Sequence, residues 1–403
     1  MTVAYKRLGD VATFVRGITF KPTDVVPAGT PSSVWCMRTK NVQGQVDLSD
    51  VWSVDSRFVK RSDQYLEEGD VLISSANSWN LVGKCCWIPR LGKASSFGGF
   101  VTALRGDVSQ VNRRYLYRWF SSAHIQETAR SFSRQTTNIA NLDLKRCADL
   151  SVPLPPLAEQ KRIAAVLDQV DALRAKRREA IALLDDLAQS TFLDMFGDPL
   201  TNPKGWPVLP FGEVCETRLG KMLDAKRETG RNSRPYLRNA NVQWMRIDTT
   251  DLLEMDFGGK DKITYGLAPG DLMICEGGEP GRAAIWRGEV EDCYFQKALH
   301  RARPNVELAR AEYLVWMLRI LSLRGGLSDH VSTATISHLT GAKLKVLPIF
   351  LPPLGLQQEF ASRLDAVEEM GERHELHLAT LDELFESVQQ RAFAGQLWDH
   401  EAA

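Results

Sequence analysis

The sequence predicts an α+β protein in which two mostly β domains are joined by two long antiparallel coiled-coil helices. Three observations support this fold class: a segment that recurs at a fixed offset, a long heptad-like stripe after each copy, and intervening segments rich in Gly, Asn, Trp and β-branched residues. A chain of 403 residues is also longer than a single core usually supports. We therefore expect an internal duplication with pseudo-twofold symmetry.

The duplication is clearest in the two proline-containing segments. Residues 154–170 read LPPLAEQKRIAAVLDQV and residues 351–367 read LPPLGLQQEFASRLDAV, an ungapped match at an offset of 197. Further upstream, Asn41-Val42-Gln43 matches Asn241-Val242-Gln243. The chain therefore divides into four predicted segments in an A–B–A′–B′ order: 1–150, 151–198, 199–350 and 351–403.

The two B segments predict long helices. Pro155 and Pro156 mark a helix start, because proline fits the first turn but not the interior. Residues 158–196 contain neither Pro nor Gly, and apolar residues recur at spacings of three and four, as in coiled coils. The predicted helix–helix and partner interface consists of Leu167, Val170, Leu184, Leu187, Leu364, Val367, Leu381 and Phe385.

Opposite charges favour an antiparallel pairing of these helices. If position 176 faces position 376, a basic cluster lies opposite an acidic one. Exposed ion pairs contribute only about 0.2–1 kcal/mol each, so they would set orientation more than stability. The alternative is two solvated charge runs that never meet. The two clusters are Arg174, Lys176, Arg177 and Arg178, and Glu368, Glu369, Glu372 and Glu375.

The two A segments predict mostly β domains. Residues 69–74 and 270–275 each indicate a turn followed by a buried strand, whereas residues 115–129 and 311–323 each predict one helix. Segment 1–150 has 20 basic and 13 acidic residues, and segment 199–350 has 21 and 18. A positive balance suits a polyanionic partner. Ordinary surface charge is the alternative.

Several function classes lack their motifs. Seven cysteines without a C-x-x-C pair disfavour a disulfide framework or zinc ribbon and fit a reducing cytoplasm. No run of about 18 apolar residues predicts a membrane helix. Metal-ligand spacings, phosphate loops and the Asn/Asp-Pro-Pro-aromatic tetrad of adenine methyltransferases are absent from the sequence. We therefore expect no enzymatic activity, catalytic residue or metal site in this chain.

Residues 152–163, VPLPPLAEQKRI, lead into the first long helix. This element and the A–B–A′–B′ order resemble the specificity (S) subunit of type I restriction–modification enzymes over the whole chain. Segment 351–403 departs from the pattern at Gly355 and Leu356, which replace Ala158 and Glu159. The resemblance implies that 1–150 and 199–350 are target recognition domains for an asymmetric bipartite DNA site. It also implies that 151–198 and 351–403 are conserved helices.

The resemblance further implies partners and cofactors. Two modification (methyltransferase) subunits that methylate adenine would dock on the helices, and restriction/translocase subunits can join them. S-adenosylmethionine, ATP and Mg would be bound by these partners and not by this chain. Double-stranded DNA is the expected ligand, the location cytoplasmic, and no membrane is involved. The alternative is a non-catalytic coiled-coil adaptor that displays two β domains to protein partners.

Candidate DNA-binding residues follow from base chemistry. Arg and Lys read guanine, Asn and Gln read adenine, and hydroxyls read either. In the resembled family, a Ser/Thr/Gln-rich loop before the LPPL element lies near the duplex. For every candidate the alternative is a capped turn or a plain surface group. The candidates, from the strongest cluster to the weakest, are Arg134, Gln135, Thr136, Thr137 and Asn138 with Ser332, Thr333 and Thr335; then Asn77, Ser78, Trp79 and Arg282; then Arg38, Lys40, Asn41, Arg238 and Asn239.

Overall fold

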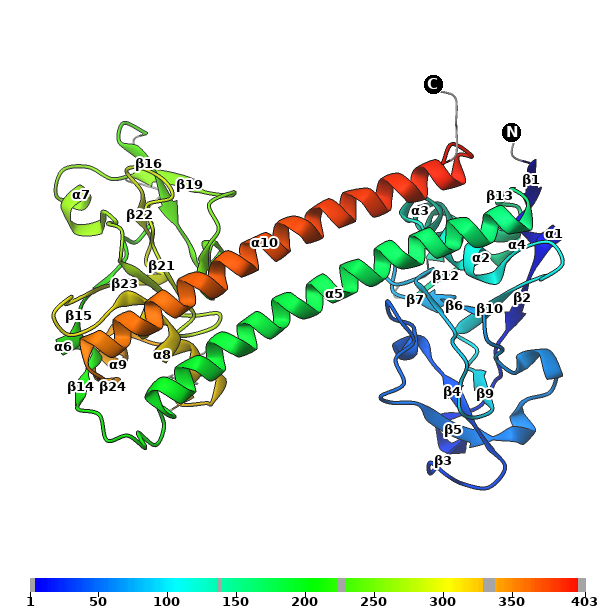
Figure 1. Ribbon diagram of the computed structural model, residues 1–403, viewed down its shortest axis with the longest axis horizontal. Coiled ribbons are helices and arrows are strands. Elements are labelled where there is room, and N and C mark those ends of the chain that lie inside the picture. Colours follow the sequence, from blue (N-terminus) through cyan, green and yellow to red (C-terminus); the bar gives the residue numbers. More distant parts are fainter. Residues whose placement is uncertain (1–3, 136–138, 224–229, 329–337, 398–403) are drawn as a thin grey trace. The chain divides into compact units, whose positions relative to one another are not determined.

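The computed structural model describes residues 4–135, 139–223, 230–328 and 338–397 (Figure 1). They form two compact units, unit 1 comprising residues 1–177 and 377–403 and unit 2 comprising residues 178–376. Two 40-residue helices, α5 (Leu157–Phe196) and α10 (Leu354–Phe393), are each shared between the units. The predicted α+β fold class, with two β-rich regions and two long helices, is confirmed.

Unit 1 is built on an antiparallel four-stranded sheet in the order β2-β10-β6-β8, beside a mixed sheet in the order β3-β5-β4-β9. Small sheets β11-β12-β7 and β1-β13 complete it. The strands are β1 (Ala4–Arg7), β2 (Ala12–Arg16), β3 (Val25–Val26), β4 (Ser33–Met37), β5 (Trp52–Asp55), β6 (Val71–Ser74), β7 (Ala76–Asn77), β8 (Cys85–Trp87), β9 (Ser95–Phe97), β10 (Val101–Gly106), β11 (Arg134–Gln135), β12 (Ala140–Asn141) and β13 (Ser151–Leu154). The α-helices are α1 (Leu8–Val11), α2 (Arg113–Phe120), α3 (Ala123–Ser131) and α4 (Leu144–Ala148).

Unit 2 repeats this plan. Its main sheet has the order β15-β23-β20-β21, beside β19-β16-β22, with small pairs β14-β24 and β17-β18. The strands are β14 (Val208–Pro210), β15 (Cys215–Leu219), β16 (Ser233–Leu237), β17 (Val242–Gln243), β18 (Arg246–Ile247), β19 (Leu253–Asp256), β20 (Leu272–Cys275), β21 (Ala283–Ile285), β22 (Tyr294–Phe295), β23 (Leu299–Pro304) and β24 (Pro348–Phe350). The α-helices are α6 (Phe211–Val214), α7 (Lys260–Tyr265), α8 (Ala311–Leu323) and α9 (Gly341–Lys345).

One predicted helix is two in the structure. The sequence predicts a single helix over 115–129, whereas α2 ends at Phe120 and α3 begins at Ala123. The hydroxyls of Ser121 and Ser122 donate to the carbonyl oxygens of Arg118 and Trp119, so they compete with continued helical bonding. The prediction over 311–323 is confirmed by α8.

The repeated Gly-Asp pair has a structural cause. Asp70 is buried and accepts two hydrogen bonds from the Arg105 guanidinium at 2.8 and 2.7 Å, and Asp271 accepts two from Arg303 at 2.7 and 2.8 Å. Such bidentate pairs are strong and geometrically specific. The preceding Gly69 has a φ of 96°, in the left-handed region that glycine tolerates. The motif therefore fixes the turn that feeds the central strand.

A buried glutamine amide connects each long helix to its β-rich region. Gln160 accepts a hydrogen bond from the Asn112 N–H at 2.8 Å and donates to the Pro155 carbonyl at 2.8 Å. In unit 2, Gln357 accepts one from the Arg310 N–H at 2.9 Å and donates to the Pro352 carbonyl at 2.8 Å. Asn112 and Arg310 are the N-cap residues of α2 and α8. The glutamine shared by the two LPPL elements therefore positions one helix start against another.

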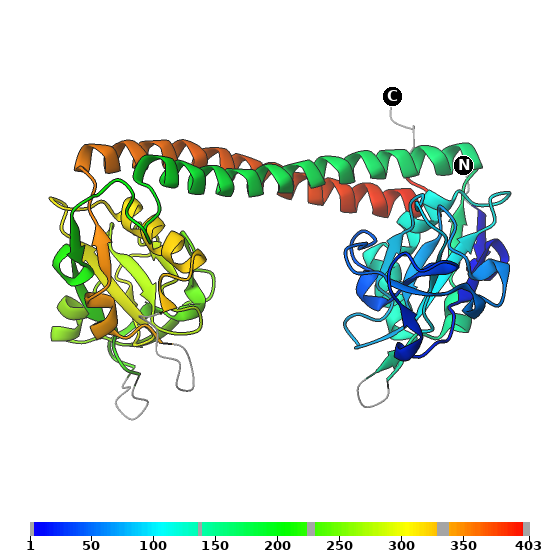
Figure 2. The same cartoon turned by 90° about the horizontal axis from the view of Figure 1, so that it is seen from below.

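Within each unit, the start of one long helix packs beside the end of the other (Figures 1 and 2). In unit 2 the rings of Phe192 and Phe196 on α5 lie 5.5 and 5.2 Å from the ring of Phe360 on α10. Tyr313 of α8 joins them at 4.9 Å from Phe196. In unit 1 the ring of Phe393 on α10 lies 5.5 Å from that of Tyr115 on α2, and the Arg174 guanidinium of α5 lies 4.5 Å from the Phe385 ring of α10. The predicted antiparallel packing is thus confirmed within each unit.

All seven cysteines are free and buried. Burial raises the pKa of Cys36, Cys86 and Cys215 to about 12 in each case. In the described part of the chain, no helix combines the length and the apolar character needed to cross a membrane.

We predict that Gln357→Ala destabilises unit 2 by about 1–3 kcal/mol, because it leaves a buried N–H and buried carbonyl oxygens without partners. The matched control is Gln358→Ala, which changes an exposed neighbour and should stay within about 0.5 kcal/mol of the parent. Urea unfolding followed by tryptophan fluorescence measures both. Equal effects of the two substitutions would contradict the role assigned to the Gln357 amide.

Candidate nucleic-acid interface

Two adjoining hollows lie on the β-rich part of unit 1. The first, here the basic hollow, has a volume of about 580 Å³, and the second, here the aromatic hollow, about 510 Å³. They share Gly99 and Phe100. The basic hollow is lined by Arg16, Ser75, Ala76, Gly99, Phe100, Thr102, Arg134, Asn141, Leu142, Asp143, Leu144 and Lys145. The aromatic hollow is lined by Ile18, Thr19, Phe20, Pro22, Arg38, Thr39, Lys40, Trp52, Gly98, Gly99, Phe100 and Val101.

The small sheet β11-β12-β7 brings two predicted clusters together. Arg134 pairs with Asn141 across the β11–β12 ladder, and Ala140 of β12 pairs with Asn77 of β7. The Arg134 side chain is 86% exposed, and an ion pair of 3.4 Å links it to Asp143. Its guanidinium is therefore available to a ligand, and Gln135 beside it is exposed.

The neighbouring candidates differ in availability. Ser78 and Trp79 are exposed, whereas the Asn77 amide accepts from the Ser78 N–H at 2.8 Å and donates to Ser74 Oγ at 3.0 Å. Asn77 therefore shapes the turn that presents Ser78 and Trp79. The other predicted members of the strongest clusters lie outside the described residues: Thr136, Thr137, Asn138, Ser332, Thr333 and Thr335.

The structure contradicts the prediction that Asn41 contacts DNA. Asn41 is 0% exposed, and its amide accepts from the Arg38 N–H at 2.7 Å and donates to the carbonyls of Asp47 and Asp50. A base has no access to it, so the prediction that Asn41 contacts DNA is wrong. The recurring Asn-Val-Gln motif reflects this fold role, because Asn241 makes the corresponding bonds in unit 2.

Arg38 and Lys40 lie at the rim of the aromatic hollow. The Arg38 guanidinium stacks on the Trp52 ring at 3.9 Å from its centroid and pairs with Asp50 at 3.1 Å. Lys40 pairs with the same carboxylate at 2.7 Å but keeps an exposed side chain. Hydrogen bonds from Lys40 and Arg38 lower the pKa of Asp50. Of the two cations, Lys40 is the more accessible.

The three described candidates of unit 2 bond to one another or to neighbouring turns. Arg282 donates to the Asn239 carbonyl at 3.0 Å, and Asn239 donates to the Gly277 carbonyl at 2.7 Å. Arg238 binds the Asp251 carbonyl at 2.6 Å and the Asp251 carboxylate at 2.7 Å. The Arg282 and Asn239 bonds hold the turn at residues 277–282 against η5 (Asn239–Asn241), and the Arg238 bonds hold Asp251 beside η5. The geometry gives Arg282, Arg238 and Asn239 a bracing role.

His300 is a buried residue that the sequence analysis did not identify. It lies on β23, and its Nε2 donates to the Leu339 carbonyl at 3.0 Å. Burial lowers the pKa of His300 from its ordinary value. Thr102 occupies the corresponding place on β10 of unit 1. A histidine among buried strand residues gives no signal in the sequence that separates it from an ordinary core residue.

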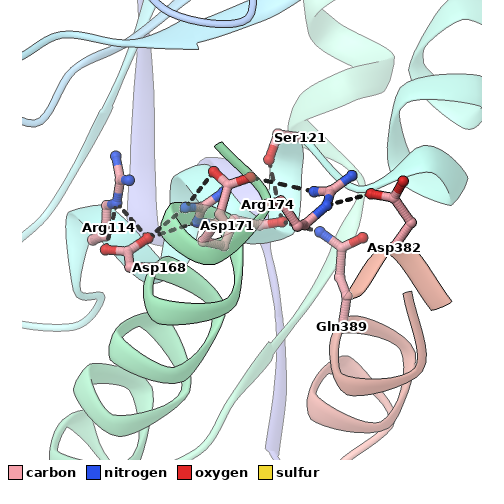
Figure 3. A network of polar contacts seen from close by, with 8 residues as sticks. Arg114, Ser121, Asp168, Asp171, Arg174, Asp382 and Gln389 are labelled. Atoms are coloured by element: carbon pink, nitrogen blue, oxygen red, sulfur yellow. Dashed lines mark hydrogen bonds and ion pairs between the residues drawn. The ribbon is translucent and has the colours of Figure 1, made fainter. Parts of the chain in front are cut away.

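A polar network joins α2, α5 and α10 in unit 1 (Figure 3). Asp168 binds Arg114 at 2.8 Å and the buried Arg118 at 2.7 Å. Arg118 also binds Asp171 at 2.9 Å. Gln389 of α10 donates to the Arg118 carbonyl at 3.1 Å. These contacts fix the end of α10 against α2 and the start of α5.

Two residues of the predicted opposing charge clusters have ion-pair partners outside those clusters. Arg174 binds Asp382, not a residue between Glu368 and Glu375 (Figure 3). Glu368 instead binds Arg287 of the β-rich part of unit 2 at 2.9 Å. A prediction of ion pairs that considers the two helices alone omits the charged residues of the β-rich regions.

The residues of the predicted helix–helix and partner interface differ in burial. Leu167, Val170 and Leu364 are buried, and Leu184, Val367, Leu381 and Phe385 are half-buried. Leu187, however, is 46% exposed, whereas Ala188 is buried. The stripe takes a four-residue step from Leu184 to Ala188, so Leu187 falls outside it. A small alanine between larger apolar residues gave a weak sequence signal.

Comparison with known proteins agrees with this architecture. The sequence matches the family model of the type I restriction modification DNA specificity domain over residues 2–183 and 203–381. It is 25% identical to the type I restriction enzyme EcoKI specificity subunit of Escherichia coli K12, over 96% of this chain and 87% of that protein. It is also 25% identical to the StySPI specificity subunit of Salmonella potsdam, with the same coverage of both chains.

Two solved structures share the fold. The S subunit of a type I restriction–modification system from M. genitalium aligns with a TM-score of 0.57 and 13% identity, covering 98% of this chain and 96% of that one. A chain from a structure concerned with complex assembly and conformational transition of the type I system aligns with a TM-score of 0.60 and 18% identity, covering 98% of both.

Among the described residues, no cluster of three or more His, Cys, Asp or Glu side chains has the arrangement of a metal site.

We predict that unit 2 loses stability as the pH falls below about 6.5, the ordinary pKa of histidine. The folded state keeps His300 neutral, so below that pH the unfolded chain binds more protons and unfolding becomes easier. His300→Thr, which introduces the unit 1 residue, should flatten this part of the profile. Urea midpoints between pH 7.5 and pH 5.5 measure it.

The control is Val306→Thr, which introduces the same side chain at an exposed position of unit 2 without removing a titrating group and should leave the slope of the pH profile unchanged. An unaltered slope in His300→Thr would contradict the assignment.

Proposed function

Because the chain belongs to the type I restriction–modification DNA specificity family, we propose that it directs adenine methylation to an asymmetric bipartite DNA site. It is the DNA specificity subunit of such a system, in a family that is non-catalytic. Family membership argues against the coiled-coil adaptor for protein partners.

One observation carries the proposal: the units share a buried framework but present different exposed residues. The pairs Asp70–Arg105 and Asp271–Arg303 are equivalent, as are Gln160 and Gln357. At the shared turn before β10 in unit 1 and β23 in unit 2, however, unit 1 carries Phe100 and unit 2 carries Ala298. Equal frameworks with unequal surfaces suit two related domains that read different half-sites.

We assign residues 1–150 and 199–350 as target recognition domains, with 151–198 and 351–403 as the conserved helices. The excess of basic over acidic residues in both recognition segments supports contact with a polyanion. We propose that Arg134, Gln135, Ser78, Trp79 and Lys40 contact DNA, and that Asn77 shapes the turn that presents Ser78 and Trp79. Arg134 and Lys40 keep exposed charges.

Exposed leucines on the long helices support docking of two modification subunits. They include Leu183 and Leu187 on α5 and Leu376 and Leu384 on α10. Apolar residues exposed on a helix are typical of a protein interface. We assign S-adenosylmethionine to these partners, and ATP and Mg to restriction/translocase subunits in the full complex. The free thiols fit assembly in a reducing cytoplasm.

Modified-base sequencing tests the function. DNA from cells that express this chain with its cognate modification subunit is compared with DNA from cells that lack this chain. We expect N6-methyladenine at a split, asymmetric motif only when the chain is present. Absence of any motif-linked methylation, with the modification subunit shown to be expressed and active, would overturn the proposal.

We predict that Arg134→Ala weakens binding of the complex to its motif by about 1–3 kcal/mol and relaxes one position if the guanidinium reads a base. If it binds a phosphate instead, affinity falls evenly across sequences and the salt dependence becomes shallower. Arg61→Ala, an exposed arginine paired with Asp63, serves as the control. Salt titrations with motif and scrambled duplexes distinguish the cases, and unchanged binding in both removes Arg134 from the interface.

A further inference from the structure

One exposed aromatic side chain lies between the two hollows of unit 1. Phe100 is 64% exposed and lines both of them. Its backbone is fixed, because its carbonyl accepts from the N–H groups of Ser75 at 3.0 Å and Ala76 at 3.2 Å. The turn closes through a bond of 2.9 Å from the Val101 N–H to the Gly98 carbonyl. A large apolar side chain is thus held in solvent by a rigid turn.

The turn is anchored on the opposite side as well. The Gly98 N–H donates to the Met37 carbonyl at 2.9 Å, and the Ile18 N–H donates to the Phe97 carbonyl at 2.8 Å. A Cβ on Gly17 would lie only 2.3 Å from the Gly98 oxygen, so the strands approach too closely for any side chain there. Keeping a phenylalanine ring in water is unfavourable, and in the free chain no contact offsets that unfavourable hydration.

Positive charge borders Phe100 on both sides. Arg16, Arg134 and Lys145 line the basic hollow, and Lys40 lines the aromatic hollow. Asp143 and Asp50 are the acidic partners of Arg134 and Lys40, whereas Arg16 and Lys145 are exposed and form no ion pair within the described residues. An apolar side chain between cations complements duplex DNA, in which stacked bases lie between two phosphate backbones.

Unit 2 contains the same turn without the aromatic ring. The Leu299 N–H donates to the Gln296 carbonyl at 3.0 Å, and the Glu276 N–H donates to the Ala298 carbonyl at 3.0 Å. These bonds correspond to those of Val101 and Ser75, which places Ala298 at the position of Phe100. The chain itself therefore offers a matched comparison, with a phenylalanine in one unit and an alanine in the other.

We propose that Phe100 is an apolar wedge that enters the base stack of the half-site read by unit 1. Arg16, Lys145 and Lys40 hold the phosphates beside it, and Ala298 leaves the other half-site stacked. The inference rests on the proposed function and deepens it. Because pyrimidine–purine steps unstack most easily, the wedge selects such a step through deformability and not through hydrogen bonds.

The experiment uses the full chain in complex with its modification subunits. Duplexes that contain the mapped motif carry 2-aminopurine at successive positions, since its fluorescence rises when the base unstacks. The half-site altered by Arg134→Ala identifies the one read by unit 1. We expect a fluorescence rise at one step of that half-site, its loss in Phe100→Ala with binding about tenfold weaker, and its retention in Phe100→Leu.

Val108→Ala is the matched control, because Val108 is an exposed apolar residue of unit 1 that lines neither hollow. It should change neither fluorescence nor affinity, and thermal unfolding should be unchanged in every variant. If the wild-type complex binds its motif without unstacking, or if Phe100→Ala unstacks the site as the wild type does, the wedge is overturned while the DNA-reading function stands. If the wild type shows no motif-dependent binding, both proposals fail.

Discussion

The arrangement of each unit depends on one buried amide. Gln160 and Gln357 are the residues through which a 40-residue helix meets the helix that follows the central sheet. Each amide bonds backbone groups on both sides, and both are almost fully removed from solvent. A buried amide with every partner in place has few alternative geometries, because any displacement leaves polar groups unpaired. The direction in which the long helix leaves the β-rich region is thereby set.

The two units solve the same packing problem with different chemistry. Unit 2 surrounds the helix ends with Phe192, Phe196, Phe360 and Tyr313. Unit 1 keeps the aromatic pair Phe393–Tyr115 but adds ion pairs around Arg118, and Gln389 stands where the internal repeat places Phe192 in unit 2. Aromatic packing depends little on ionic strength, whereas partly exposed ion pairs are screened by salt. The repeated backbone therefore tolerates substitution of an apolar junction by a polar one.

The sequence predicted the architecture better than the side chains that act on a ligand. The LPPL repeat and the heptad stripe are local patterns, so they revealed the duplication and both long helices. Asn41 failed as a DNA contact because a polar residue in a loop gives the same signal whether it faces solvent or caps a buried turn. Phe100 was missed because an exposed phenylalanine resembles a core residue in sequence, and only its exposed fraction in the folded turn shows that it faces solvent.

The burial of every cysteine has a consequence for the chemistry that the chain undergoes. A thiol reacts with oxidants and electrophiles as the thiolate, and raising the pKa of Cys36, Cys86 and Cys215 to about 12 leaves almost none of that form at neutral pH. Burial also keeps reagents away from the sulfur atoms. Both effects slow the reaction of the folded subunit with maleimides and peroxide. A cysteine introduced at an exposed serine would carry a dye at that site with little background labelling.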